Sequence, residues 1–266
     1  MKTRLTLIAF FISLFAFSEA TAQQCNVVNT AFQAGENIQY NLYFNKGIVR
    51  IRSGRGSLVI ENTNFRGAPA YKTTMLLNTS GFANAVYTVN DTLISYVDKN
   101  LRPLLFTKNA FEGKDYSIER QSFTYDGDQI NIETSRIFNG IQRFDETVTT
   151  DKCTYDYLSV LLYVRNLDFD NMKPGDRQHI QFISGRNPVN MYVNFLGTST
   201  LRADDGNRYN VINISLTILD DAFQNQRDAI RASLSNDANR IPVVIDTVLR
   251  IGTVRAMMRG FSGQRN

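Results

Sequence analysis

The sequence contains a single histidine, two cysteines and no tryptophan. A zinc site would have to draw on His179, Cys25, Cys153 and carboxylates, because zinc takes three or four protein ligands. No HExxH or CxxC spacing brings such ligands together. Neither cysteine has a neighbouring motif typical of nucleophilic or redox catalysis, and the position of His179 in an alternating run favours a surface or structural role. The sequence therefore predicts no metal site and no cofactor.

Motifs of common enzyme classes are also missing. There is no G-x-S-x-G elbow, no Walker loop and no dinucleotide-binding fingerprint. The nearest glycine-rich stretch, residues 53–57, lacks the lysine and the following helix of a phosphate-binding loop. Acidic pairs occur at 204–205 and 220–221, but the first belongs to an Asp-Gly turn and the second to a predicted helix start. We therefore expect a protein that is not an enzyme.

Long apolar runs are confined to the beginning of the chain. Lys2 and Arg4 precede an apolar run over residues 5–17, and residues 20–22 (Ala-Thr-Ala) fit a signal peptidase site. The run is shorter than the roughly 20 residues that span a bilayer, although a retained anchor is the alternative. We predict a signal peptide at 1–22, no transmembrane segment after its cleavage, and a periplasmic location in a Gram-negative bacterium.

The excess of positive charge is small and scattered. The chain has 29 Lys and Arg residues against 25 Asp and Glu residues, a net charge of +4. Removal of the leader lowers this value slightly, because Lys2, Arg4 and Glu19 leave with it. The remaining basic residues do not form the stripe or tail that nucleic-acid binding requires. No nucleic-acid partner is expected.

Cys25 lies close to the predicted cleavage site, so lipid anchoring has to be considered. A lipidated cysteine normally follows a small residue, whereas Gln23 and Gln24 precede Cys25. This argues against a lipoprotein. In an oxidising compartment the natural pairing is a Cys25–Cys153 disulfide, with two unpaired cysteines as the alternative.

Alternation of apolar and polar residues dominates the remaining chain, as is typical of half-buried strands. A short turn at 53–55 is expected between strands at 48–51 and 56–60. Asp-Gly and Asn-Gly dipeptides, which suit tight hairpins, occur at 126–127, 139–140 and 205–206. We predict an all-β, mainly antiparallel fold, either a strongly curved sheet or an open β-barrel with one or two packed helices. It should form a single domain over residues 23–266.

One segment has helical spacing. Leu158, Leu162 and Arg165 share one side of a helix predicted within 155–165, and Thr154 is its candidate N-cap. We expect the leucine face to pack on the sheet. A second, polar helix is a candidate over residues 221–232, where the periodicity is weaker.

Three short blocks carry a resemblance. Residues 32–40 fit F-x-x-G-E-x-I/L-x-Y, residues 156–165 fit D-x-L-S-x-x-x-Y-x-R, and residues 235–254 contain S-x-D-x-x-R-x-P-V followed by I-G-x-V. In this order they resemble the domain of unknown function 3108 family, exported proteins of Gram-negative bacteria. The resemblance implies an extracytoplasmic β-rich protein and carries no activity. Its residues, for which we expect structural roles, are Gly35, Glu36, Tyr40, Asp156, Ser159, Arg165, Asp237, Arg240, Pro242 and Gly252.

The first block also has a direct physical interpretation. Gly35 permits a turn or a close backbone approach before the strand. Glu36 can accept backbone N–H bonds or pair with an arginine, and Arg165 and Arg240 are the candidate partners. A role of Glu36 as a general acid or as a ligand contact is the alternative.

The third block predicts a structural hairpin. Asn and Asp residues at 235–240 suit a tight turn, which an Asp237–Arg240 salt bridge could lock. Pro242 would then begin the next strand, where its missing N–H does least harm. Gly252, which interrupts the last strand, indicates a bulge or a close packing contact.

A strongly curved sheet presents a concave face, which favours binding over catalysis. We predict a non-catalytic envelope protein that binds an apolar or polymeric ligand, a lipid or a glycan, on this face. A scaffold partner in an envelope complex that uses an exposed sheet edge is the first alternative. A hydrolase acting on envelope glycan or lipid is the second.

Overall fold

The chain forms one large sheet that surrounds a short helix. The structure is a computed structural model, and it describes residues 25–219, 228, 230–249 and 252–266. The predicted leader at 1–22 lies outside the described residues.

The first half of the chain contains eight strands: β1 (Asn37–Lys46), β2 (Val49–Phe65), β3 (Ala68–Thr79), β4 (Val89–Asp98), β5 (Pro103–Glu112), β6 (Asp115–Asp126), β7 (Gln129–Phe138) and β8 (Ile141–Thr150). The second half contains β9 (Thr154–Tyr155), β10 (Arg177–Ser184), β11 (Asn187–Arg202), β12 (Arg208–Leu219), β13 (Ile230–Ser235), β14 (Pro242–Leu249) and β15 (Gly252–Ser262). The helices are short: α1 (Phe82–Val86), α2 (Ser159–Arg165) and the 3-10 helix η1 (Phe169–Asn171).

Sequence neighbours are also neighbours in the sheet. The strand order is β8-β7-β6-β5-β4-β3-β2-β1-β15-β14-β13-β12-β11-β10-β9. The pairs are antiparallel, except that β9 runs parallel to β10. Two meanders, β1–β8 and β10–β15, join where β1 pairs with β15, with Ile38 opposite Phe261. The predicted all-β, mainly antiparallel fold is confirmed.

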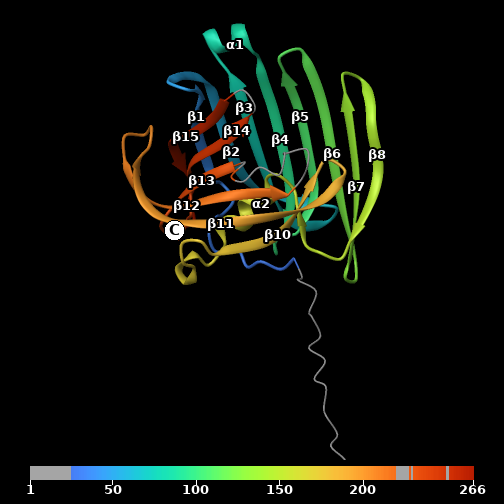
Figure 1. Ribbon diagram of the computed structural model, residues 1–266. Helices are drawn as coiled ribbons and strands as arrows, with labels where there is room; N and C mark the ends of the chain where they lie inside the picture. The colour runs from blue at the N-terminus through green and yellow to red at the C-terminus, as the bar shows by residue number, and fades with distance from the viewer. Residues whose placement is uncertain (1–24, 220–227, 229, 250–251) are drawn as a thin grey trace, which may run out of the picture.

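The sheet curls into a nearly closed barrel (Figure 1). Its first edge, formed by β7 and β8, approaches the turn between β10 and β11. The Thr134 hydroxyl donates a hydrogen bond to the Gly185 carbonyl at 2.7 Å. Arg186 Nη1 lies 3.0 Å from Glu146 Oε1. The two edges of the sheet are therefore joined by side-chain contacts to the β10–β11 turn, and not by backbone hydrogen bonds between paired strands.

Helix α2 lies inside the curve of the sheet (Figure 1). Leu158 and Leu162 are fully buried, which confirms that the leucine face packs on the sheet. The Tyr157 ring bridges the two halves of the barrel, with centroids 5.5 Å from Phe106 on β5 and 4.8 Å from Phe182 on β10. The helix fills the apolar interior because the sheet surrounds it on several sides.

The N-terminal cap of α2 is Asp156, and the prediction of Thr154 was wrong. Asp156 Oδ1 accepts hydrogen bonds from the backbone N–H groups of Leu158 and Ser159, at 2.8 and 3.0 Å. The Ser159 hydroxyl accepts in return from the Asp156 N–H at 2.8 Å. Such reciprocal bonds satisfy N–H groups that lack partners within the helix. Thr154 instead belongs to β9, and its hydroxyl donates to Gln181.

Two further predictions need correction. Residues 53–55 form no turn, because β2 continues through them from Val49 to Phe65. A Cβ on Gly54 would lie 2.0 Å from the Asn78 carbonyl oxygen, so glycine here permits close passage of β3. The second candidate helix at 221–232 lies largely outside the described residues, and its end belongs to strand β13. The predicted hairpin dipeptides at 126–127, 139–140 and 205–206 do lie between strands.

Candidate functional site

A buried ion pair lies at the end of α2. Arg165 Nη1 donates to Glu36 Oε1 at 2.5 Å and Nη2 donates to Oε2 at 2.7 Å. Neither side chain is exposed to solvent. The predicted partnership of Glu36 with an arginine is thus seen with Arg165, not with Arg240. This two-pronged pairing gives each carboxylate oxygen a hydrogen bond, and a buried charge is stable only when it is paired and hydrogen-bonded in this way.

Glycines at both termini shape the approach to this pair. Gly35 has φ 97°, and its N–H donates to the Ile60 carbonyl at 2.8 Å. A Cβ on Gly263 would lie 2.1 Å from the Gly35 carbonyl oxygen. The turn before β1 therefore fits closely against the C-terminal segment, and Gly263 is the glycine that permits this contact. Of the two roles predicted for Gly35, the turn is seen, because a Cβ on Gly35 itself would have nothing within 4 Å.

The third sequence block meets the first two at the same place. Arg165 Nη2 also donates to the Asn239 carbonyl at 2.9 Å. The Tyr40 hydroxyl donates to the Pro242 carbonyl at 2.9 Å, and burial raises the pKa of this phenol. Asp156 is connected to β4, because its Oδ2 accepts from the Ser95 hydroxyl at 2.8 Å. The three blocks thus form one buried centre around Arg165.

The turn at 235–240 is held by Asp237. Its Oδ1 accepts hydrogen bonds from the Ser235 hydroxyl at 2.8 Å and from the Asn239 N–H at 2.9 Å. The expected Asp237–Arg240 salt bridge is not the one formed, because Arg240 has φ 50° and directs its guanidinium to Asp170, at 3.3 Å. Pro242 begins β14 as predicted.

Gly252 begins β15 and does not interrupt it. A Cβ there would lie 2.5 Å from the Asn45 carbonyl oxygen and 2.9 Å from the Phe44 ring. The close packing contact is present at the strand end, where β14 turns into β15.

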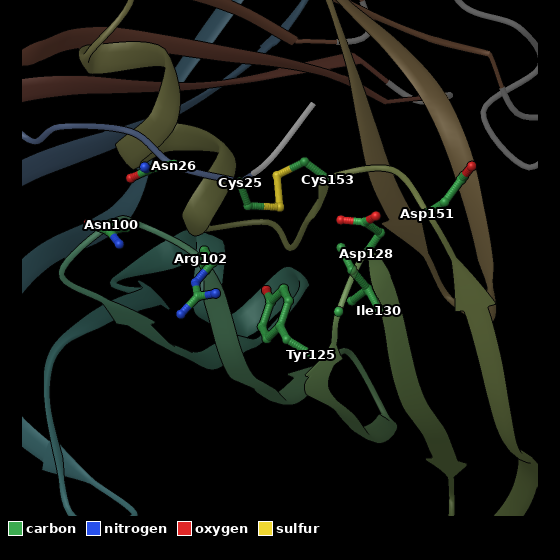
Figure 2. Close-up of a pocket in the computed structure, with 10 residues that line it drawn as sticks. Cys25, Asn26, Asn100, Arg102, Tyr125, Asp128, Ile130, Asp151 and Cys153 are labelled. Carbon is green, nitrogen blue, oxygen red and sulfur yellow. A yellow bond between two sulfur atoms is a disulfide. The ribbon is translucent and has the colours of Figure 1, made fainter. Parts of the chain in front are cut away.

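Cys25 and Cys153 form a disulfide in the wall of a shallow cleft (Figure 2). Tyr125, Ile130 and Asp128 line the neighbouring wall, with the Asp128 carboxylate beside the disulfide. The Tyr125 hydroxyl donates to the Pro103 carbonyl at 2.8 Å, and burial raises the pKa of this phenol. The cleft has a volume of about 200 Å³, below the roughly 300–1,000 Å³ of most ligand pockets. It is too small for a polymer or a lipid tail.

A second region, on the inner face of β4–β7, has polar side chains where an apolar core would be expected. Leu93, which packs with Leu158 in the core, lies directly opposite Lys108 on the next strand. Lys108 is opposite Glu119, and Glu119 is opposite Arg136. Opposite residues of antiparallel strands point to the same side, so this row faces inward. The polar inner face comprises Asp91, Lys108, Glu119, Gln121 and Arg136.

Two ion pairs lie on the polar inner face, at the row that contains Lys108, Glu119 and Arg136. Lys108 Nζ lies 3.4 Å from Glu112 Oε1, and Arg136 Nε lies 3.4 Å from Glu119 Oε1. The Lys108 and Arg136 side chains are 24% and 39% exposed, so both charges are accessible to solvent. A ligand can therefore reach this row.

Gln121 lies one inward position below Glu119 on β6. It is 1% exposed, and neither its amide nitrogen nor its amide oxygen has a hydrogen-bond partner among the described residues. A buried polar group without a partner costs about 1–3 kcal/mol, so native proteins rarely keep one without a reason. The unsatisfied amide of Gln121 therefore indicates a place on this face where a ligand could supply the missing hydrogen bonds.

Asp91 lies on the same face of β4. Its pKa is raised to about 6, chiefly by burial and then by the neighbouring Glu112 carboxylate. Its Oδ1 has no hydrogen-bond partner among the described residues. The Glu112 carboxylate is thus a near neighbour of Asp91 on this face.

The polar inner face was not predicted from the sequence. Ser117, Glu119 and Gln121 alternate at period two along β6, which is a strand signal. The intervening positions, Ile118 and Arg120, are of mixed polarity, so the sequence does not mark the polar side of this strand as its inner face. The inner face is identified only by strand pairing, which places Gln121 opposite the buried Phe106 and Lys108 opposite the buried Leu93.

The remaining predicted positions add no reactive centre. His179 Nε2 lies 2.9 Å from Asn190 Oδ1, in a surface hydrogen bond. No group of three His, Cys, Asp or Glu side chains suited to a metal ion occurs within the described part of the chain. None of the helices described there is long and apolar enough to cross a membrane.

Comparisons with known proteins identify a family. Residues 39–259 match the family described as "Protein of unknown function (DUF3108)". No curated protein is significantly similar to the chain. A solved β-barrel-like protein of domain of unknown function DUF1849 from Brucella abortus is 12% identical, with a TM-score of 0.60 over 89% of this chain and 100% of that one. A Bacteroides fragilis protein with a YmcC-like fold is 10% identical, with a TM-score of 0.36 over 89% and 99%. The Brucella likeness shows the same fold, and the chain belongs to the DUF3108 family of proteins of unknown function.

Proposed function

We propose that the protein is a non-catalytic binding protein of the cell envelope that holds a glycan on its polar inner face. The observation that carries this proposal is the buried Gln121 amide, which has no hydrogen-bond partner among the described residues and lies beneath the accessible charges of Lys108 and Arg136. Carbohydrate hydroxyl groups both donate and accept hydrogen bonds, and therefore match an amide that offers a donor and an acceptor. Lys108, Glu119 and Arg136, in the row next to Gln121, add charged groups that can also form hydrogen bonds with hydroxyl groups.

A glycan is favoured over a lipid because the apolar interior is filled. Leu162 of α2 and Leu158 just before it are fully buried, and the Tyr157 ring contacts both Phe106 and Phe182. An acyl chain would have to displace these side chains. A hydroxylated chain can lie along the polar inner face without disturbing them.

The envelope location is supported by two features. The first 22 residues have the pattern of a secretory signal. The Cys25–Cys153 disulfide is of a kind that persists in oxidising compartments. The periplasm meets both requirements.

The alternatives receive less support. A scaffold role requires an apolar sheet edge, whereas the edge strand β8 carries Arg143, Asp145 and Glu146, and charges protect an edge from pairing. A hydrolase requires two acids around the bond that is cleaved, whereas the most deeply buried unpartnered side chain of this face, among the described residues, is the Gln121 amide, which is neither an acid nor a base. Binding without catalysis therefore accounts best for the site.

Native mass spectrometry of the protein, exported with its own leader and purified gently, is the first test. We expect an added mass in the oligosaccharide range that is lost on denaturation. The protein should also bind members of an array of peptidoglycan fragments, lipopolysaccharide cores and capsular repeats. Gln121→Leu should weaken this binding at least tenfold.

The matched control is Gln129→Leu, at the exposed beginning of β7. It makes the same chemical change far from the polar inner face and should bind like the wild type. A wild-type protein that binds no member of the array, or equal binding by Gln121→Leu, would refute the proposal.

A further inference from the structure

The hairpin tips at one end of the barrel form a distinct surface. In an antiparallel meander alternate turns lie at the same end, so the tips β1–β2, β3–β4, β5–β6 and β7–β8 are grouped there (Figure 1, top). They comprise residues 46–52, 80–88, 111–116 and 138–143. We call these four segments the tip surface.

Large apolar side chains are exposed on every one of these tips. Ile48 is fully exposed, and Phe82, Val86 and Ile141 are 78%, 70% and 57% exposed. The complete set is Ile48, Val49, Ile51, Phe82, Val86, Tyr87, Phe111, Tyr116 and Ile141. The four turns at the other end, within the described residues, expose no large apolar side chain, and Leu101 there is buried. At the other end the exposed apolar side chain is Val28 of the N-terminal segment, next to Val27, whose N–H donates to the Asn100 carbonyl. The concentration of exposed apolar side chains on the tips indicates a contact surface.

Backbone hydrogen bonds hold the four tips together. The Ser80 N–H donates to the Ser53 carbonyl at 3.0 Å. The Gly113 N–H donates to the Thr88 carbonyl at 2.7 Å. The Asn139 N–H donates to the Tyr116 carbonyl at 2.8 Å. The tips are therefore linked as neighbours along one rim.

The charges of the two ends differ as well. The tip surface carries five cations, Lys46, Arg50, Arg52, Lys114 and Arg143, against the two acids Glu112 and Asp115. The turns at the other end, residues 65–68, 98–103, 126–129 and 150–153, carry four cations and four acids. Among these turns of the first meander, those at the apolar end carry a net positive charge and those at the other end carry none.

We infer that the tip surface docks on an anionic lipid surface. Apolar side chains enter the headgroup region, cations bind lipid phosphates, and tyrosines such as Tyr87 and Tyr116 suit the interface with water. All three occur together on the tip surface and not at the opposite end. This inference goes beyond glycan binding, because it uses none of the residues of the polar inner face.

The absence of tryptophan allows a direct test. Phe82→Trp introduces a single fluorophore on the tip surface, and Leu196→Trp introduces one at an exposed position of β11. With vesicles of phosphatidylethanolamine and phosphatidylglycerol, we expect a blue shift of the Phe82→Trp emission and none for Leu196→Trp. Vesicles of phosphatidylcholine alone should give a much smaller shift.

Flotation with the same vesicles provides the second readout. The double variant Phe82→Ser/Val86→Ser should float at least tenfold less than the wild type, and Leu196→Ser should float normally. Lys46→Glu/Arg50→Glu should lose binding to the anionic vesicles, while Arg66→Glu/Lys152→Glu at the other end should not. Circular dichroism confirms that each variant is folded.

Failure of the wild type to float, or equal flotation of the tip variants, would overturn the inference. A Phe82→Trp emission that shifts only with an added envelope protein would assign the tip surface to a protein partner, and would overturn it too. Glycan binding by the same samples is measured separately, so the two proposals can fail independently.

Discussion

Arg165 and Glu36 face each other in a two-pronged ion pair with neither side chain exposed. They come from sequence blocks 129 residues apart. The pair joins the helix inside the barrel to the turn that begins β1, and a third bond from Arg165 to the Asn239 carbonyl adds the C-terminal hairpin. One side chain thus connects three distant parts of the chain.

Loss of one member of this pair should destabilise the protein strongly. Glu36→Gln leaves the Arg165 charge buried and without its counterion, so we expect a loss of about 3–5 kcal/mol in the free energy of unfolding. The double variant Glu36→Gln/Arg165→Met, which removes both charges, should lose less than the sum of the single losses. Urea denaturation followed by circular dichroism measures both. Additive losses would show that the two charges do not interact.

The disulfide should stabilise the protein through the length of the loop it closes. Cys25 and Cys153 are separated by 128 positions, and closure of a loop of this length corresponds to at most about 5 kcal/mol. Cys25→Ser/Cys153→Ser should therefore unfold at clearly lower urea concentration. A reducing agent should lower the wild-type midpoint to the same value and leave the double variant unchanged. If the reductant lowered both midpoints equally, the disulfide would not be the cause.

Asp91 should make stability depend on pH. The pKa of its carboxyl group rises from the usual 3.8 to about 6 in the folded protein, so the folded state disfavours its charged form. Its contribution to stability is therefore lost as pH rises from about 4 through 6. Asp91→Asn should be more stable than the wild type at pH 7, by about 1–2 kcal/mol, and equal to it near pH 4. Urea midpoints across this range are the measurement, and parallel curves would contradict the assignment.

Gln121→Leu should weaken glycan binding but stabilise the ligand-free protein. Its buried amide has no hydrogen-bond partner among the described residues. Gln121→Leu replaces this unsatisfied polar side chain with an apolar one of similar size. We expect the ligand-free protein to gain about 1 kcal/mol in unfolding free energy. Thermal unfolding of the variant and of Gln129→Leu compares the buried with the exposed position. A destabilised Gln121→Leu would mean that the amide is satisfied in the free protein.

Much of the architecture could be predicted because alternation is a local property. Most strands, the helix around Leu162, and the Asp-Gly and Asn-Gly turns follow from short windows of sequence. The cap of α2 was misplaced by two residues, because Thr154 and Asp156 are both good caps and only the geometry of β9 excludes the first. Likewise, Gly54 suggested a turn, and only the close passage of β3 explains it.

The candidate site could not be predicted, because it depends on register between strands. Lys108, Glu119 and Arg136 are far apart in sequence and become one row only when β5, β6 and β7 align. The Glu36–Arg165 pair was foreseen as one of two possibilities. The choice between Arg165 and Arg240 required knowing that α2 lies inside the barrel and that the turn at 235–240 faces Asp170.

The pairing of β1 with β15 has a consequence for the newly made chain. A polypeptide is synthesised from its N-terminus, so β1 exists long before residues 252–262, its partners across the ladder, have been added. Until then Tyr40 and Leu42 have one open flank, and the Arg165 guanidinium lacks the Asn239 carbonyl. The barrel can close only after residues 252–262 have emerged, and an unfinished chain must be kept from aggregating along this flank in the meantime.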